Sequence, residues 1–166
     1  MRKTIIFMAA AVWCAGQPAT VTAQEAPSTG DIDRVRTTID AALAAISRED
    51  FVALTDLMIE EAVFFPTVTR DGVDRYSVRT RAAQRAAATD VDFVERGFDP
   101  EIRISGPIAS VWLPYDLYLD GKWSHCGVDT FILVRVEGTW KIATMAWSAV
   151  QPPECTAHPD GAPGSN

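Results

Sequence analysis

A histidine and a cysteine stand side by side in the stretch G-K-W-S-H-C-G-V-D-T-F, residues 121–131. Such a pair can form an activated thiolate, ligate a metal ion, or serve two unrelated roles. Successive side chains of an extended strand point to opposite faces, so we expect His125 and Cys126 to diverge. A thiolate pair would require a bulge at Gly127, and that alternative stays open.

A metal site has few possible ligands in this chain. The sequence contains two histidines, His125 and His158, and the second lies in the C-terminal tail. Asp129 shares the strand face of His125, but four strand residues separate the two by about 13 Å. Zinc ligands lie about 2 Å from the ion, so these two side chains cannot share one. We therefore expect no metal and no cofactor.

A disulfide is a simpler role for Cys126. In the mature form of an exported chain, Cys126 and Cys155 would be the two remaining cysteines, one in a central strand and one just after the last strand. Exported proteins commonly pair such cysteines. The bond would fasten residues 151–155 across the sheet, and loop closure gives it a stabilisation of about 3 kcal/mol.

The first 23 residues have the composition of a secretory signal peptide. A basic head at residues 2–3 precedes an apolar run from Ile5 to Ala15, which is too short to span a bilayer. Small residues at positions 21 and 23 favour cleavage after Ala23. We expect a periplasmic or secreted protein that leaves the membrane once the signal is removed.

Cleavage would also remove Cys14. The alternative to cleavage after Ala23 is a lipoprotein signal with a lipid anchor on Cys14, but lipoprotein processing needs a small residue before the cysteine, and Trp13 is bulky. The net charge would change from −7 to −9 with the loss of Arg2 and Lys3. So acidic a chain argues against nucleic-acid binding, and no basic amphipathic segment suits an anionic membrane.

About 140 mature residues suffice for one domain with its own core. The composition divides them into a flexible leader at 24–30, a folded domain at 31–151, and a Pro/Gly-rich tail at 152–166. We expect this tail to be tied at Cys155 and mostly disordered beyond it.

Within the domain, helical patterns come first and strand patterns follow. Ser28 or Asp31 can cap an amphipathic helix that extends to about residue 46, and a shorter helix begins near Asp50. Residues 59–68 predict a strand, and the composition of 75–88 favours a third helix. The remaining strand patterns are 91–98, 101–104, 107–119, 122–136 and 139–150. This order predicts an α+β fold in which N-terminal helices pack on a strongly curved antiparallel sheet.

The last hairpins read V-W-L-P-Y-D-L-Y-L-D-G-K-W-S-H-C-G-V-D-T-F-I-L-V-R-V-E-G-T-W-K-I-A, with a turn glycine before Trp140 and Ile142. This segment resembles exported, lumazine-binding-like members of the nuclear-transport-factor-2-like superfamily, which has ketosteroid-isomerase-like and polyketide-cyclase-like (SnoaL-like) branches. The resemblance covers about residues 31–150. It implies a cystatin-like cone with a pocket between sheet and helices. Such pockets serve isomerisation, dehydration, cyclisation, hydrolysis, ligand binding or dimerisation, so the fold does not decide the function.

Aromatic and titratable residues concentrate on the three longest predicted strands. The leading hypothesis is therefore a domain that binds a small apolar or aromatic molecule. The residues that we expect to line its pocket are Trp112, Tyr115, His125, Asp129 and Trp147. The enzyme alternative is cofactor-independent acid/base catalysis by an isomerase, dehydratase, cyclase or hydrolase, with His125, Asp129 or Tyr115 as the candidate groups.

Two other interpretations remain open. The outer face of the sheet can form a homodimer; a concentration-independent dimer would favour this role, and a strict monomer would exclude it. The arginines before and along the expected third helix are either a solvated face or an anion site, because Arg81 and Arg85 share one side of that helix. Those arginines are Arg70, Arg75, Arg79, Arg81 and Arg85. A one-residue slip in strand register would reverse every facial assignment.

Overall fold

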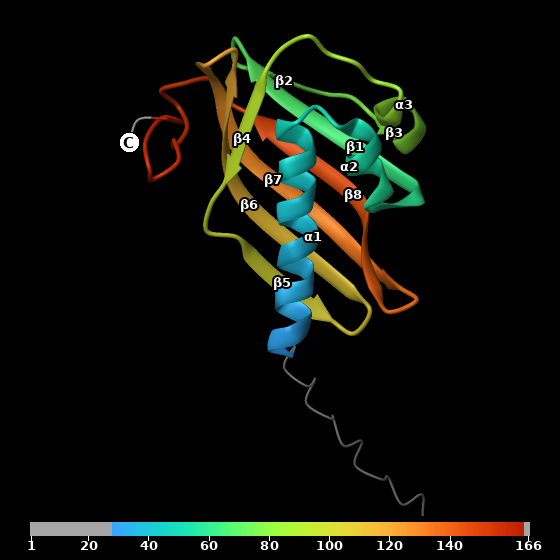
Figure 1. Ribbon diagram of the computed structural model, residues 1–166. Coiled ribbons are helices and arrows are strands. Elements are labelled where there is room, and N and C mark those ends of the chain that lie inside the picture. Colours follow the sequence, from blue (N-terminus) through green and yellow to red (C-terminus); the bar gives the residue numbers. More distant parts are fainter. Residues whose placement is uncertain (1–27, 165–166) are drawn as a thin grey trace, which may run out of the picture.

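The computed structural model describes residues 28–164, so the expected signal peptide and most of the leader lie outside this range. Helices α1, α2 and α3 pack on one strongly curled sheet (Figure 1). The element bounds are α1 (Thr29–Ser47), α2 (Phe51–Asp56), β1 (Met58–Arg70), β2 (Val73–Tyr76), β3 (Arg79–Thr80), α3 (Arg81–Arg85), β4 (Phe93–Gly97), β5 (Glu101–Ser105), β6 (Ile108–Leu119), β7 (Lys122–Val136) and β8 (Thr139–Ala149). No helix within residues 28–164 has the length and apolar content to cross a membrane.

The first two helices begin at polar caps, as the sequence predicts. The Ser28 hydroxyl accepts the N–H of Asp31 at 3.2 Å before α1, and the Asp50 carboxylate accepts the N–H of Ala53 at 2.8 Å before α2. Both helices bury an apolar stripe against the concave face of the sheet (Figure 1). The core formed there includes Val35, Ile39, Leu54, Phe64, Phe131, Leu133 and Ile142.

The sheet runs in the order β2-β1-β8-β7-β6-β4, with β3 paired to β1 and β5 paired to β6. Every pair is antiparallel except β1 with β8, which are parallel. The predicted α+β fold is confirmed, and its sheet is mixed at this one junction. The first long strand and the last strand thereby lie side by side, so the N-terminal helices are held over a sheet built mainly by the C-terminal half.

The helix expected over residues 75–88 is wrong over most of its length. Val73–Tyr76 forms β2 and pairs with β1 across a turn at Asp71 and Gly72, both with positive φ. Only Arg81–Arg85 is helical, and Thr80 caps it by accepting the N–H of Ala83 at 3.2 Å. Backbone pairing with a long neighbouring strand outweighs the helix propensity of this segment.

The tail is also more ordered than its composition predicts. Cys126 and Cys155 form a disulfide, the pairing that the sequence favours, with Cα atoms 5.7 Å apart. Beyond it, the backbone N–H of His158 donates to Asp116 Oδ2 at 3.0 Å. Asp116 is 0% exposed and also accepts two bonds from Arg96, at 3.0 and 2.6 Å. A buried carboxylate requires such donors, and the tail provides one of them.

Candidate functional site

A cavity of about 290 Å³ lies between the concave face of the sheet and the helices. This volume is just below the range for small-molecule sites, which begins at about 300 Å³. Its apolar lining comes from Ile46, Phe51, Leu54, Phe64, Phe93, Leu117, Met145 and Trp147. Its polar lining comes from Arg79, Gln84, Glu95, Tyr115 and His125. The cavity therefore combines apolar walls with a few polar groups, the composition typical of a ligand site.

His125 and Cys126 diverge across β7, as the alternation of a strand predicts. Cys126 reaches the tail on one face, and His125 lines the cavity on the other. The register of β6 against β7 shifts between Leu117 and Tyr118, away from Gly127. Because the sulfur of Cys126 is bonded to Cys155, no thiolate pair forms with His125.

Gly127 permits an unusually close approach of β8 to this part of β7. A Cβ at Gly127 would overlap the backbone carbonyl oxygen of Ser148. The hydroxyl of Tyr115 donates to that same carbonyl at 2.9 Å, and the Tyr115 ring meets the His125 ring edge-on with centroids 5.9 Å apart. Glycine is therefore required here, because any side chain would collide with the backbone of Ser148.

Two carboxyl groups in this region have buried oxygens that lack partners. Asp129 is 1% exposed, and Glu95 lines the cavity from β4. Within the described part of the chain, Oδ2 of Asp129 and Oε1 of Glu95 accept or donate no hydrogen bond. Burial raises the pKa of Glu95 to about 7; burial, together with the charge of Glu95, raises the pKa of Asp129 well above its ordinary value. Burial therefore disfavours the ionised form of both carboxyl groups.

Tyr115 and His125 lie in ring contact beside these carboxyl groups, and both have shifted pKa values. Burial raises the pKa of the Tyr115 hydroxyl, and the charges of Asp129 and Glu95 raise it further, so the hydroxyl stays protonated. Burial lowers the pKa of His125, which favours the neutral imidazole. Its Nδ1 lies 3.0 Å from the Ser124 hydroxyl. We call Glu95, Tyr115, His125 and Asp129 the acid cluster.

Glu95 is the member of the acid cluster that sequence analysis missed. The Ser47 hydroxyl at the end of α1 donates to the Glu95 carbonyl at 3.3 Å and accepts the Glu95 N–H at 3.2 Å. These two bonds fix the edge strand β4 against α1. Phe93 and Glu95 are two residues apart and share a strand face, and this alternation is the signal by which the sequence could have revealed Glu95.

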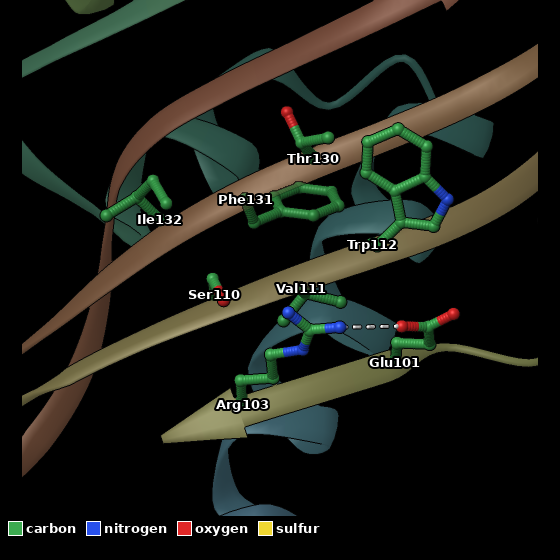
Figure 2. A pocket seen from close by; sticks show the side chains of 8 residues that line it. All are labelled: Glu101, Arg103, Ser110, Val111, Trp112, Thr130, Phe131 and Ile132. Atoms are coloured by element: carbon green, nitrogen blue, oxygen red, sulfur yellow. Dashed lines mark hydrogen bonds and ion pairs between the residues drawn. The ribbon is translucent and has the colours of Figure 1, made fainter. Parts of the chain in front are cut away.

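Trp112 does not line the cavity, which corrects the sequence prediction. It is 53% exposed and lies on the outer face of the sheet. Figure 2 shows it at a groove over β5, β6 and β7 with Glu101, Arg103, Ser110, Thr130 and Ile132. Trp112 and Tyr115 are three residues apart on one strand, and an odd spacing places them on opposite faces.

The other four predicted residues gather on the cavity side. Tyr115, His125 and Trp147 line the cavity, and Asp129 lies buried within electrostatic range of Tyr115. Trp147 meets Phe64 edge-on with centroids 6.5 Å apart, which makes one wall aromatic. Across residues 28–164, no three His, Cys, Asp or Glu side chains are grouped so that they could hold a metal ion.

Known proteins share this architecture. The model of the SnoaL-like domain family matches residues 35–152. A protein of unknown function from Mycobacterium tuberculosis is similar in structure, with a TM-score of 0.61, 18% identity, and coverage of 76% of this chain and 80% of that chain. A cystatin-like-fold protein of unknown function from Nostoc punctiforme has a TM-score of 0.61, 7% identity, and coverage of 76% and 96%. A candidate dehydratase of the NTF2-like family from Streptomyces avermitilis has a TM-score of 0.57, 20% identity, and coverage of 73% and 96%.

At these identities the structural likenesses show the fold alone. Among curated proteins, none matches the sequence of this chain. The superfamily that the last hairpins resemble is confirmed by the family match and by the shared fold.

The protonation of Glu95 predicts a specific pH dependence of stability. The folded chain keeps the proton of Glu95 up to a pKa of about 7, whereas the ordinary value is 4.5, so the free energy of unfolding should fall as pH rises between these values. We expect a loss of about 2 kcal/mol, less than the full shift implies, because solvent enters the open cavity. Urea unfolding across this pH range measures it. In the Glu95→Gln variant, the free energy of unfolding should depend less steeply on pH.

The matched control is Glu61→Gln, which removes an exposed carboxylate from β1. This variant should keep the wild-type slope. Equal slopes in wild type and Glu95→Gln would show that Glu95 does not bind a proton in the folded state.

Proposed function

Because the chain belongs to the SnoaL-like domain family of the nuclear-transport-factor-2-like superfamily, we propose that it is an exported domain that binds a small, largely apolar or aromatic molecule in its cavity. The observation that carries this proposal is the lining of the cavity, with apolar walls around a small set of polar groups. The fold hosts many functions, so the proposal rests on these side chains.

The unpartnered oxygens of the acid cluster support a ligand with a polar group. A buried oxygen without a hydrogen bond costs about 1 to 3 kcal/mol, and a bound ligand can offset this cost. Glu95 lines the cavity, and its carboxyl group, when protonated, can donate to a carbonyl or hydroxyl oxygen of the ligand. Phe64 and Trp147 then contact the apolar body of the same molecule.

Removal of the aromatic wall should weaken binding. We expect Trp147→Ala to reduce the affinity for the best ligand of an aromatic metabolite library about tenfold or more, because it deletes a large apolar contact. Isothermal titration calorimetry measures the change. Trp112→Ala is the matched control, since it removes a tryptophan from the outer face, and it should bind as wild type does. Equal effects of the two variants, or no ligand in the library, would contradict the proposal.

Acid/base catalysis in the same cavity is the second candidate function. The observation that favours it is the pKa of Glu95 near 7, because a group that titrates near the working pH is the most effective proton acceptor. Burial and the charge of Glu95 raise the pKa of Asp129, and the neutral imidazole that burial favours at His125 can accept or donate a proton. Tyr115 is less suited than the sequence suggests, because its hydroxyl already donates to Ser148.

Proton abstraction next to a carbonyl tests this candidate directly. If Glu95 is the base, the wild-type protein in D₂O should exchange the α-hydrogens of phenylacetone, followed by proton NMR. Glu95→Gln should slow the exchange about 100-fold or more, since an amide cannot accept the proton. Glu61→Gln should exchange at the wild-type rate. Exchange at the buffer rate with the wild-type protein would refute this reaction.

The Cys126–Cys155 disulfide supports the proposal of export, because such bonds persist in oxidising compartments. Mass spectrometry of the protein from a periplasmic or culture extract should find a mature chain that begins after Ala23 and lacks free thiols. A full-length chain with reduced cysteines in the cytoplasm would contradict export.

The homodimer stays a prediction. Its support is that the outer face of β6 and β7 exposes large apolar side chains in the described chain. These are Ile108, Trp112, Ile132 and Val136.

A further inference from the structure

An arginine lines the cavity on the side away from the acid cluster. Strand β3 pairs with β1 so that Arg79 lies opposite Phe64. Directly opposed residues of an antiparallel pair project from the same face, and both side chains line the cavity. In the sheet order, β3 attaches to β1 near one end and β4 forms the other end. Arg79 and Glu95 therefore approach the cavity from opposite sides.

Arg79 has no acidic partner among the described residues. Its guanidinium donates to the side-chain oxygen of Gln84, a neutral and buried group. No ion pair of the described chain includes Arg79. A guanidinium carries five N–H donors in a planar fork that matches a carboxylate, so most of its binding capacity remains for a ligand.

The neighbouring arginines differ from Arg79 in this respect. Arg81 donates to the Thr55 carbonyl at 2.9 Å and pairs with Glu60 at 2.7 Å. Arg85 pairs with Asp56 at 2.6 Å. These two arginines fasten α3 to α2 and β1, so they are structural rather than the anion site that their helical spacing suggests.

We propose that the cavity selects ligands with an anionic carboxylate at one end of an apolar body, and that Arg79 is the specificity residue that binds this carboxylate. This inference deepens the proposed function and rests on it. The carboxylate lies against the Arg79 guanidinium, the apolar body contacts Phe64 and Trp147, and a carbonyl or hydroxyl at the far end meets the acid cluster.

The acid cluster does not oppose an anion in this arrangement. Burial raises the pKa values of Glu95 and Asp129, which reduces the negative charge at that side. Arg79 stays cationic at any physiological pH. The two sides of the cavity thus differ in charge, so a ligand with one anionic end has a preferred orientation.

A charged ligand and its neutral isostere test the inference. The probes are 4-oxo-4-phenylbutanoate, which carries an aryl ketone and a carboxylate, and 4-oxo-4-phenylbutanamide. By calorimetry the wild-type protein should bind the acid at least tenfold more tightly than the amide. Arg79→Gln should remove this difference, and Arg79→Lys should keep part of it. The control Arg75→Gln, an exposed arginine on β2, should keep all of it.

The outcomes separate this inference from the function on which it rests. Equal binding of acid and amide to the wild-type protein overturns the carboxylate site and leaves the small-molecule function standing. A preference for the acid that survives Arg79→Gln also overturns it. If neither probe nor any member of the aromatic library binds, both proposals fail.

A salt titration of the wild-type protein keeps the test decisive if Arg79→Gln, which leaves Gln84 without its partner, does not fold. Higher ionic strength should weaken binding of the acid and leave binding of the amide unchanged. Equal salt dependence of the two probes would overturn the carboxylate site.

Discussion

Alternation of side chains along β7 is the constraint on which the rest of the structure depends. One face of this strand directs Cys126 to the tail, and the other directs His125 and Asp129 toward the cavity. Gly127 follows Cys126 on this strand, and its lack of a side chain lets the backbone carbonyl of Ser148 approach closely. That carbonyl accepts the hydrogen bond of the Tyr115 hydroxyl. A shift of one residue in register would exchange the two faces and destroy both the disulfide and the site.

Two buried acidic residues on opposite faces of the sheet differ in how their carboxyl groups are hydrogen-bonded. Asp116, on the outer face, accepts two bonds from Arg96 and one from the backbone of the tail. Asp129, on the inner face, has an oxygen without a partner and a raised pKa. The first arrangement stabilises the tail on the sheet. The second leaves an oxygen of Asp129 without a hydrogen bond, within electrostatic range of Glu95 and Tyr115, which line the cavity. This is why the inner face is the candidate for chemistry.

The two proposed functions, ligand binding and acid/base catalysis, would use the same geometry. Burial against apolar walls disfavours the charged form of Glu95 and raises its pKa to about 7. A proton acceptor of this kind requires a fixed position, which the two bonds between Ser47 and the backbone of Glu95 supply. The helix that covers the sheet thus also positions a titratable group, so the packing of the core and the properties of the site are inseparable.

Local patterns in the sequence determined the caps of the first two helices, the extent of the last two strands, the divergence of His125 from Cys126, and a pairing of cysteines. These depend on neighbouring residues or on a count of cysteines, so no tertiary contact is needed to deduce them. Only the tertiary structure decided that Trp112 lies outside, that residues 73–76 pair with β1, and that the tail donates to Asp116. It also brought Glu95 into the cavity from a short edge strand. The physical reason is that pairing and burial are set by residues far apart in the chain, and the energy of those contacts outweighs local preference.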